Sequence, residues 1–323
     1  MINIAIDAMG GDSGSSVITA AIKKLCIDYP ELSFMVFGDA SELKSIVGIC
    51  TVVATTQVMN MEDGALAIRR KSDSSMVKAI ESVRDGSTQG IVSCGSTGAL
   101  LAGSLLLLKT FETLERPALM LTYPSVYQTG TDILDIGSNA ENTSTQLLQF
   151  AKMGNAFAKN VRNIENPRVA LLNIGSEDKK GDTVHKETFD LINQQKDINF
   201  IGNIEGRDLL MGVADVIITD GFSGNIALKT MEGTAAAYQI LLKDVFNTNL
   251  LNKLAALVIA KELRIAKGHL DYRKYGGAVL AGINYPVIKA HGSSDSEAFY
   301  NAVLQCKKLI DTSAIDKMKK DIV

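Results

Sequence analysis

The sequence predicts an α/β protein with a doubly wound, mostly parallel sheet. Short β-branched runs recur along the 323 residues, and most are followed by a longer stretch of helical periodicity, the pattern of parallel βαβ units. The junctions also repeat, because a Val/Ile-rich run ends in a Gly/Ser/Thr turn that opens a helix, most clearly in Val216–Lys229. A hydrophobic content of 46% allows a chain of this length to bury a sizeable core.

The expected elements follow from these runs in chain order. The expected strands are Ile2–Ile6, Ser33–Phe37, Thr51–Ala54, Gly90–Ser93, Ala118–Thr122, Ile133–Ile136, Val169–Ile174, the first residues of Val216–Lys229, and Val279–Ile288. The expected helices are Ser15–Cys26, Ala40–Val47, Ser74–Asp85, Ala99–Leu108 and Met231–Phe246. In Ser74–Asp85, for example, Met76, Ile80 and Val83 recur at helical spacing.

No linker, low-complexity tract or internal repeat divides the chain, so we expect one domain over residues 1–323. The stretch Leu114–Val126, with Pro117 and Pro124, either links two lobes or joins elements within one.

The segment Thr230–Lys274 differs from the βαβ units in its pattern of apolar and basic residues. Its stretch Leu250–Ala260 is apolar nearly all round, and a basic cluster follows it. The basic residues are Lys261, Arg264, Lys267, His269, Arg273 and Lys274. We therefore expect a protruding helical hairpin over residues 245–275. Such a hairpin either docks on an anionic membrane surface or an acidic partner, or is buried in a dimer interface.

Composition narrows the classes of function. A net charge of −3, from 33 basic and 36 acidic residues, argues against general nucleic-acid binding. The four cysteines form no CxxC pair, which suits reduced thiols in a cytosol, and the three histidines lack the spacing of a metal site. The chain starts directly with a strand and has no apolar run of membrane-spanning length, so we expect a cytoplasmic protein.

The glycine-rich turns after the expected strands are candidates for binding an anion. Backbone N–H groups at a helix N-terminus favour phosphate, and in an open α/β sheet ligands bind at the edge formed by the carboxyl ends of the strands. The turns nominated for phosphate are Ser96–Gly98, Gly221–Asn225 and His291–Ser294. Any one of them also serves as an ordinary tight turn, but their recurrence favours a ligand site.

Several motifs occur in a fixed order from end to end of the chain. They are A-I-D-A-M-G-G-D (Ala5–Asp12), A-I-R-R-K-S-D-S-S-M (Ala67–Met76), S-C-G-S-T-G-A-L (Ser93–Leu100), L-D-I-G-S-N (Leu134–Asn139), L-L-Q-F-A (Leu147–Ala151), N-I-G-S-E-D-K-K-G-D (Asn173–Asp182), D-G-F-S-G-N-I-A-L-K (Asp220–Lys229), D-Y-R-K-Y-G-G-A-V-L-A-G (Asp271–Gly282) and P-V-I-K-A-H-G-S-S (Pro286–Ser294). As an ordered set they resemble the bacterial phosphate acyltransferase family of phospholipid synthesis (PlsX). The chain departs from the family pattern at Ser13, usually histidine, at Ser96, usually asparagine, and in Ala140–Thr143.

The resemblance implies an enzyme that moves the long-chain acyl group of acyl carrier protein (ACP) to inorganic phosphate. The products are an acyl phosphate and free ACP, and the acyl phosphate passes to a membrane glycerol-3-phosphate acyltransferase, which implies peripheral contact with the inner face of the cell membrane. The family's α/β/α fold resembles that of isocitrate and isopropylmalate dehydrogenases and of phosphotransacetylase. The resemblance also implies that the protein forms a homodimer and uses no metal or other cofactor.

Attack of phosphate on a thioester requires a site for the dianion, stabilisation of the tetrahedral oxyanion and a route for the leaving thiolate. We expect direct transfer, because a pantetheine thiol leaves readily and no His–Asn pattern accompanies Cys94 as a nucleophile. The expected catalytic residues are Lys180, His291 and Asn225. The expected phosphate- or substrate-binding residues are Gly10, Gly11, Asp12, Ser96, Thr97, Gly98, Asn139, Asp182, Asp220, Ser223, Gly224, Ser293 and Ser294.

Some of these assignments have structural alternatives. Lys180 either orients phosphate or the thioester oxygen, or is a solvated loop lysine, and His291 is an acid or base, a hydrogen-bond donor, or a structural histidine. Two basic groups compete for the acidic ACP, although charge runs are often only exposed faces. The first group is Arg69, Arg70 and Lys71, and the second is Lys261, Arg264 and Lys267.

Two other classes of function are weighed against the acyltransferase. An NAD(P)-dependent dehydrogenase on a related fold requires a G-x-G-x-x-G fingerprint that opens a helix, and the sequence has none. A non-catalytic membrane-surface scaffold built on Leu250–Lys274 would bind lipid without forming acyl phosphate.

Overall fold

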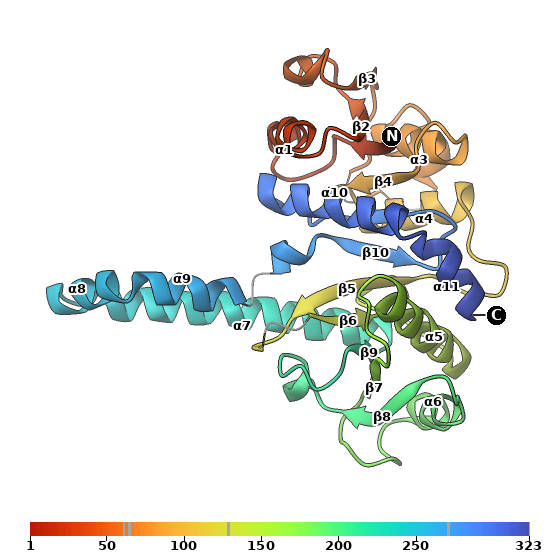
Figure 1. The fold of residues 1–323 in the computed structure, drawn as a ribbon, viewed down its shortest axis with the longest axis vertical. Coiled ribbons are helices and arrows are strands. Elements are labelled where there is room, and N and C mark those ends of the chain that lie inside the picture. The colour runs from red at the N-terminus through yellow and green to blue at the C-terminus, as the bar shows by residue number, and fades with distance from the viewer. Residues whose placement is uncertain (61, 64–65, 128–129, 270–271, 323) are drawn as a thin grey trace.

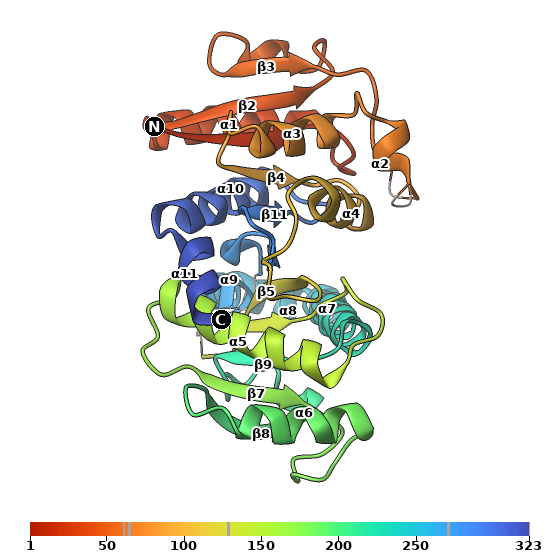
Figure 2. The same cartoon turned by 90° about the vertical axis from the view of Figure 1, so that its right-hand side faces the viewer.

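The structure is a computed structural model that describes residues 1–60, 62–63, 66–127, 130–269 and 272–322 (Figures 1 and 2). The strands are β1 (Ile2–Asp7), β2 (Leu32–Gly38), β3 (Thr51–Ala54), β4 (Gly90–Ser93), β5 (Ala118–Pro124), β6 (Gly130–Leu134), β7 (Arg168–Leu172), β8 (Asn199–Ile204), β9 (Val216–Ile218), β10 (Ala278–Ala281) and β11 (Val287–Lys289). The helices are α1 (Ser15–Asp28), α2 (Ala67–Arg70), α3 (Ser75–Arg84), α4 (Thr97–Leu107), α5 (Ser144–Asn160), α6 (Thr183–Asn193), α7 (Gly221–Asn247), α8 (Leu250–Val258), α9 (Ala260–His269), α10 (Ser296–Asp311) and α11 (Ala314–Ile322).

One sheet runs through the described residues in the order β3-β2-β1-β4-β11-β10-β5-β6-β9-β7-β8. The strands from β3 to β11 are parallel to one another, and so are those from β6 to β8. At the centre, β10 pairs antiparallel with β11 and β5, and β5 pairs antiparallel with β6. The predicted α/β class with a mostly parallel sheet is confirmed. The two parallel halves nevertheless point in opposite directions, so their carboxyl ends lie at opposite edges, and the expectation of one shared edge is wrong.

Two sequence runs form different elements from those expected. Val279–Ile288 divides into β10 and β11, because Gly282 between them adopts a φ of 95° that turns the chain back. Ala40–Val47 contributes only a 3₁₀ turn at Lys44–Ile46. There the carboxylate of Asp39 accepts hydrogen bonds from the backbone N–H and hydroxyl of Ser41, and this local turn competes with a helix start.

Helices cover both faces of the sheet, as in a doubly wound fold. Side chains of α1, α5, α6, α10 and α11 form one hydrophobic core with the first face, and the fully buried Phe150 and Phe299 lie there. Side chains of α2, α3, α4 and α7 form the second core, which includes Met76 and Leu228. Figure 2 shows α4 and α7 on the same side of the sheet. This second face carries the cavity described below.

α7 is the longest helix of the described part of the chain and leaves the body of the molecule. Its 27 residues extend about 40 Å at 1.5 Å per residue. The distal part of α7, together with α8 and α9, forms a helical projection that points away from the sheet (Figure 1). The projection begins before the expected residue 245, since Tyr238, Leu241 and Val245 of α7 are already exposed. Among the described residues, no helix combines the length and the apolar character that a membrane crossing requires.

Candidate active site

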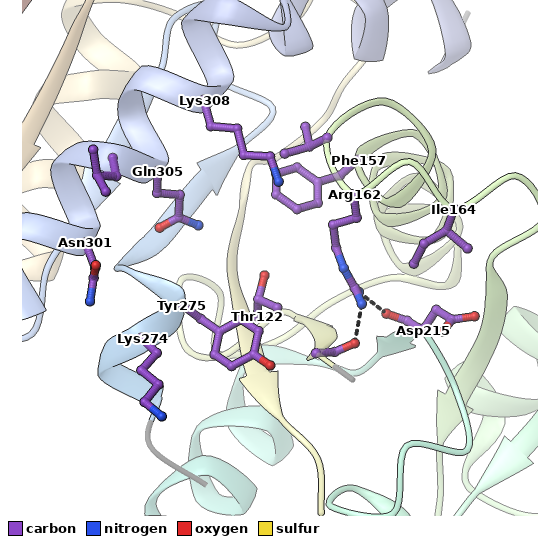
Figure 3. Close-up of a pocket in the computed structure, with 13 residues that line it drawn as sticks. Thr122, Phe157, Arg162, Ile164, Asp215, Lys274, Tyr275, Asn301, Gln305 and Lys308 are labelled. Atoms are coloured by element: carbon purple, nitrogen blue, oxygen red, sulfur yellow. Dashed lines mark hydrogen bonds between the residues drawn. The ribbon is translucent and has the colours of Figure 1, made fainter. Parts of the chain in front are cut away.

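We compare two cavities near the centre of the sheet, one on each face. The larger, about 710 Å³, lies on the face covered by α5 and α10 and is shown in Figure 3. Its arginine is already neutralised, because Nη1 of Arg162 lies 2.9 Å from the buried Asp132 carboxylate and also donates to the carbonyl oxygen of Asp215. None of the residues expected to bind substrate lines it. Size alone therefore does not identify the active site.

The smaller cavity, about 400 Å³, lies on the second face between α4 and α7. Four of the predicted site residues line it, namely Asp12, Thr97, Asn225 and His291. Leu119 and Leu121 of β5 and Leu228 of α7 contribute apolar walls. This combination of apolar walls with a few polar groups is typical of a small-molecule site, so we take this cavity as the candidate active site.

The short central strands explain how both edges of the sheet reach one cavity. β10 has four residues and β11 has three, which span about 10–13 Å at 3.3 Å per residue. Asn225 and Gly137, from the end of the second half, therefore line the same space as Asp12 and His291, from the end of the first half. α7 connects the two edges, because its residues from Asn225 to Glu232 follow one wall.

The turns after β1, β4 and β11 meet at the first of these edges. The N–H of Asp12 donates to the carbonyl oxygen of Gly292 at 2.9 Å. Gly10 adopts a φ of 80°, and an added Cβ would lie 3.3 Å from Cα of Gly95, so the first two turns approach closely. The predicted residues Gly10, Gly11, Ser293 and Ser294 thus belong to the turns that carry Asp12 and His291.

α4 directs its N-terminus toward the cavity. The hydroxyl of Ser96 accepts a hydrogen bond from the N–H of Ala99 and caps the helix, while Thr97 lines the cavity. The next residue, Gly98, has no side chain, and it is exposed. Since a helix N-terminus attracts negative charge, this turn is the best placed of the nominated phosphate turns. Ser96 serves there as the cap.

The turn at Gly221–Asn225 does not offer the expected phosphate donors. The Asp220 carboxylate accepts from the N–H of Ser223 at 2.8 Å and caps α7. The N–H of Gly221 donates to Oδ1 of Asn142, and the N–H of Gly224 donates to the carbonyl oxygen of Asp220. These donors are occupied within the fold, so Asp220, Ser223 and Gly224 hold the helix start and only Asn225 of this turn lines the cavity.

The side-chain amide of Asn139 also makes its hydrogen bonds within the fold. It is 5% exposed, and its Nδ2 donates to the carbonyl oxygen of Pro117 at 2.8 Å and to the carboxylate of Asp135 at 2.9 Å. The same Asp135 carboxylate accepts from the N–H groups of Leu119 and Gly137. Asn139 therefore stabilises the turn on which α7 packs and does not line the cavity.

Lys180 and Asp182 lie farther out, after β7, which is separated from β6 by β9. Nζ of Lys180 lies 3.5 Å from Glu177, and Asp182 caps α6 by accepting from the N–H of His185. In this single chain neither residue lines the cavity. The described residues hold no group of three or more His, Cys, Asp or Glu side chains arranged to bind a metal ion.

His291 is positioned as a neutral hydrogen-bond donor. Its Nδ1 accepts from the backbone N–H of Ser293 at 3.2 Å, so the neutral ring carries its proton on Nε2. Partial burial lowers the pKa of His291, and the positive charge of Lys229 lowers it further. Lys229 itself is paired with Glu232 at 2.8 Å.

We expect His291 to titrate below the ordinary histidine value of about 6.5 in an NMR pH titration. Its folded-state pKa lies below that of the unfolded chain, so its charging disfavours the folded state as the pH falls through about 6.5. Lys229→Met should raise the midpoint, because it removes a neighbouring positive charge. Lys308→Met, in the other cavity, is the matched control and should leave it unchanged. A midpoint above 6.5 would contradict this geometry.

Lys289 is a further cavity residue and is not among the site residues expected from the sequence. It is the last residue of β11, is 8% exposed, and lines the cavity beside His291. Its ammonium donates to the carbonyl oxygens of Cys94 and Ala290. The sequence feature that could have identified Lys289 is its position at the end of an otherwise apolar strand, within P-V-I-K-A-H-G-S-S.

The basic residues expected to bind ACP divide into two groups. Arg69 and Arg70 are exposed on α2, whose Ile68 packs near Gly103 of α4, whereas Lys71 is held by Asp63. Lys261 and Arg264 are exposed on α9 in the projection, and the side chain of Lys267 lies outside the described residues. The α2 group therefore lies on a helix that packs near α4, whose N-terminal Thr97 lines the cavity, whereas the α9 group lies on the projection.

Solved structures with the same fold cover nearly the whole chain. A phosphotransacetylase from Streptococcus pyogenes superposes with a TM-score of 0.63 at 17% identity, covering 98% of this chain and 94% of its own. An isocitrate dehydrogenase from Methylococcus capsulatus gives a TM-score of 0.51 at 11% identity, covering 99% and 88%. The predicted relation to the isocitrate dehydrogenase-like fold is confirmed. At these identities the comparison establishes the fold alone.

Sequence relatives establish the class of enzyme. A phosphate acyltransferase from Streptococcus agalactiae serotype Ia is 43% identical over 323 residues, covering 98% of both chains. A phosphate acyltransferase from Staphylococcus haemolyticus is 41% identical, covering all of this chain and 98% of its own. The protein is therefore an acyltransferase, and the dehydrogenase and non-catalytic scaffold alternatives have no support from these relatives.

The particular family follows from a match over almost the full length. The sequence model of the family described as "Fatty acid synthesis protein" matches residues 2–317. The chain belongs to this family, and its reaction class is the transfer of an acyl group to phosphate. The resemblance read from the ordered motifs is confirmed.

Proposed function

We propose that the enzyme transfers the long-chain acyl group of acyl-ACP to inorganic phosphate in the cavity between α4 and α7. The products are an acyl phosphate, which serves phospholipid synthesis, and free ACP. The observation that carries the proposal is that one cavity joins the N-terminus of α4, the ring of His291 and the amide of Asn225 with apolar walls. Relatives named phosphate acyltransferase support the reaction class.

Phosphate binds in this proposal at the start of α4. The backbone at Thr97 and Gly98 supplies N–H donors and the positive end of the helix dipole. Nε2 of His291 donates one hydrogen bond, and Asn225 donates another from the opposite wall. These donors can also bind the oxyanion that develops at the thioester carbonyl, which is where preorganised donors lower the barrier most.

The thioester lies along the apolar walls, with the acyl chain against Leu119, Leu121 and Leu228. Phosphate attacks the carbonyl carbon directly. Cys94 is not the nucleophile in this mechanism, because burial raises the pKa of its thiol to about 12 and the side chain is 4% exposed. No cofactor takes part in the proposed reaction.

A combined assay tests the proposal. Purified protein is mixed with palmitoyl-ACP, and free ACP thiol and a hydroxylamine-trappable acyl product are followed with and without phosphate. We expect both products, in equal amounts, only when phosphate is present. Thiol release without a trappable product would mean hydrolysis. A folded sample that releases neither, but binds liposomes, would support the scaffold function instead.

ACP docks, in this proposal, on α2. Arg69 and Arg70 are exposed and have no partner among the described residues, so they are available to acidic residues of ACP. Their helix packs near α4, which carries Thr97 into the cavity. Lys261 and Arg264 lie on the projection and are assigned to the membrane surface.

Charge reversal separates these two basic groups. Arg70→Glu should weaken ACP binding about tenfold at low salt and reduce its salt dependence, because steering by surface charge is screened by ions. Arg264→Glu is the matched control and should leave ACP binding within twofold. The measurement is a titration of ACP affinity between low and physiological salt. A larger loss in Arg264→Glu than in Arg70→Glu would place the docking site on the projection.

We propose two further contacts of the protein, both made by the projection. Its exposed apolar residues include Leu250, Leu251, Leu257 and Val258. Such a surface suits peripheral contact with the cytoplasmic side of a membrane, close to the glycerol-3-phosphate acyltransferase that consumes the product, and it also suits the seam of a homodimer.

A further inference from the structure

Lys289 carries a buried charge that the proposed phosphate site does not use. Its side chain is 8% exposed, and its ammonium donates to two carbonyl oxygens, those of Cys94 at 3.3 Å and of Ala290. An ammonium has three N–H donors. The third has no acceptor among the described residues, although Lys289 forms part of the cavity wall. A buried charged group is costly, and one with a spare donor at a cavity is suited to act on a ligand.

Asp7 is a buried carboxyl group that acts electrostatically on this ammonium. It is the last residue of β1 and is 1% exposed, and its carboxylate accepts from the hydroxyls of Ser75 and Ser93, both at 2.6 Å. Burial lowers the pKa of Lys289, whereas the charge of Asp7 acts in the opposite direction. The ammonium of Lys289 therefore gives up a proton more readily than that of a surface lysine.

Three other charged or titratable groups face Lys289 from the surrounding elements. Asp12 follows β1, Cys94 follows β4, and Lys229 lies on α7. Burial keeps Cys94 protonated, and Lys229 is paired with Glu232. His291 also lines the cavity, its pKa is lowered by burial, and its neutral ring donates from Nε2, so we expect it to bind oxygen atoms without supplying a charged acid.

We infer that Lys289 is the acid that protonates the sulfur of the departing pantetheine thiol. The inference rests on the proposed acyl transfer to phosphate and assigns its proton route. An oxygen of HPO₄²⁻ forms the bond to the thioester carbon, the C–S bond breaks, and the sulfur takes a proton from the ammonium of Lys289. The resulting amine then takes the proton of the phosphate hydroxyl. The net change moves one proton from phosphate to thiol and leaves Lys289 unchanged.

A comparison of leaving groups tests this role. An alkyl thiolate, as in pantetheine, is basic and needs a proton to leave, whereas a thiophenolate is weakly basic and does not. Lys289→Met should lower kcat on palmitoyl-pantetheine about 10²–10³-fold, a typical size for the loss of a general acid. On the S-phenyl thioester of palmitate, the same variant should lose less than about fivefold in kcat. Each loss is measured relative to the unmodified enzyme on the same substrate. Lys229→Met is the control and should affect both esters equally.

A second variant and a second reaction keep the test decisive if the methionine variant folds poorly. Lys289→Arg retains the charge and the hydrogen bonds, but a guanidinium does not release its proton. It should keep the KM for phosphate within about threefold and show the same selective loss on the alkyl thioester. In the reverse reaction, acyl phosphate plus pantetheine, its rate should rise about tenfold per pH unit until the pantetheine thiol is ionised.

Equal losses on the alkyl and aryl esters, or a reverse reaction without the added pH dependence, would overturn the inference while leaving acyl transfer intact. Failure of the unmodified enzyme to form acyl phosphate would instead overturn the proposed function. The two failures are therefore distinguishable in the same set of measurements.

Discussion

Gly224→Ala should lower the free energy of unfolding by about 3 kcal/mol, at the upper end of overpacking costs. An added Cβ at this position would lie 1.9 Å from the backbone oxygen of Asp135, and a backbone oxygen cannot rotate out of the way. The turn that carries Asp135 is itself fixed, because the carboxylate accepts several backbone N–H groups. α7 would therefore have to move off the sheet.

Gly233→Ala is the matched control on the same helix. A Cβ there meets nothing within 4 Å, so alanine should raise stability by about 0.5–1 kcal/mol through helix propensity. Urea unfolding of both variants measures the difference. Equal stability of the two variants would show that α7 does not pack against the Asp135 turn as described.

His291→Ala should lower kcat/KM for phosphate about 10²–10³-fold, which corresponds to roughly 3–4 kcal/mol of transition-state stabilisation. The Nε2–H of His291 is the proposed donor to phosphate, and the side chain is accessible at the turn after β11. Its removal should therefore change stability by less than about 0.5 kcal/mol.

Two further variants control this prediction. His291→Gln keeps an N–H donor near the same place and should recover part of the activity. His185→Ala removes a histidine that is bonded to Asp182 outside the cavity, and it should leave kcat/KM within about threefold. Steady-state kinetics at fixed acyl-ACP and varied phosphate provides the comparison. A larger effect at His185 than at His291 would move the phosphate site toward α6.

The fold class was predictable from the sequence because each parallel strand and its helix lie next to one another in the chain. The reversal of the second half of the sheet was not predictable in the same way. A short apolar run such as Ala118–Thr122 has the same sequence pattern whether the strand is parallel or antiparallel. The direction of the strand is decided by its pairing with runs that are distant in the sequence. The division of Val279–Ile288 into two strands depended on one glycine, Gly282.

The site was predictable to the level of turns, but not of individual donors. A helix cap and a phosphate site use the same N–H groups, and the choice depends on neighbours distant in sequence. At α7 the neighbour is Asn142, which occupies the N–H of Gly221, whereas at α4 Thr97 faces the cavity. Lys289 was missed because a lysine that ends a strand is usually solvated. Its burial became evident only when β11 was placed between β4 and β10.

Isotope exchange between acyl-ACP and labelled free ACP tests direct acyl transfer to phosphate most directly. If phosphate itself attacks the thioester, label should enter acyl-ACP only when phosphate is present, through reversible formation of acyl phosphate. Exchange without phosphate would mean that an enzyme side chain takes the acyl group first, and Ser293, whose hydroxyl lies 2.8 Å from Nδ1 of His291, would be the residue to examine. Absence of exchange under both conditions would contradict acyl transfer by this cavity altogether.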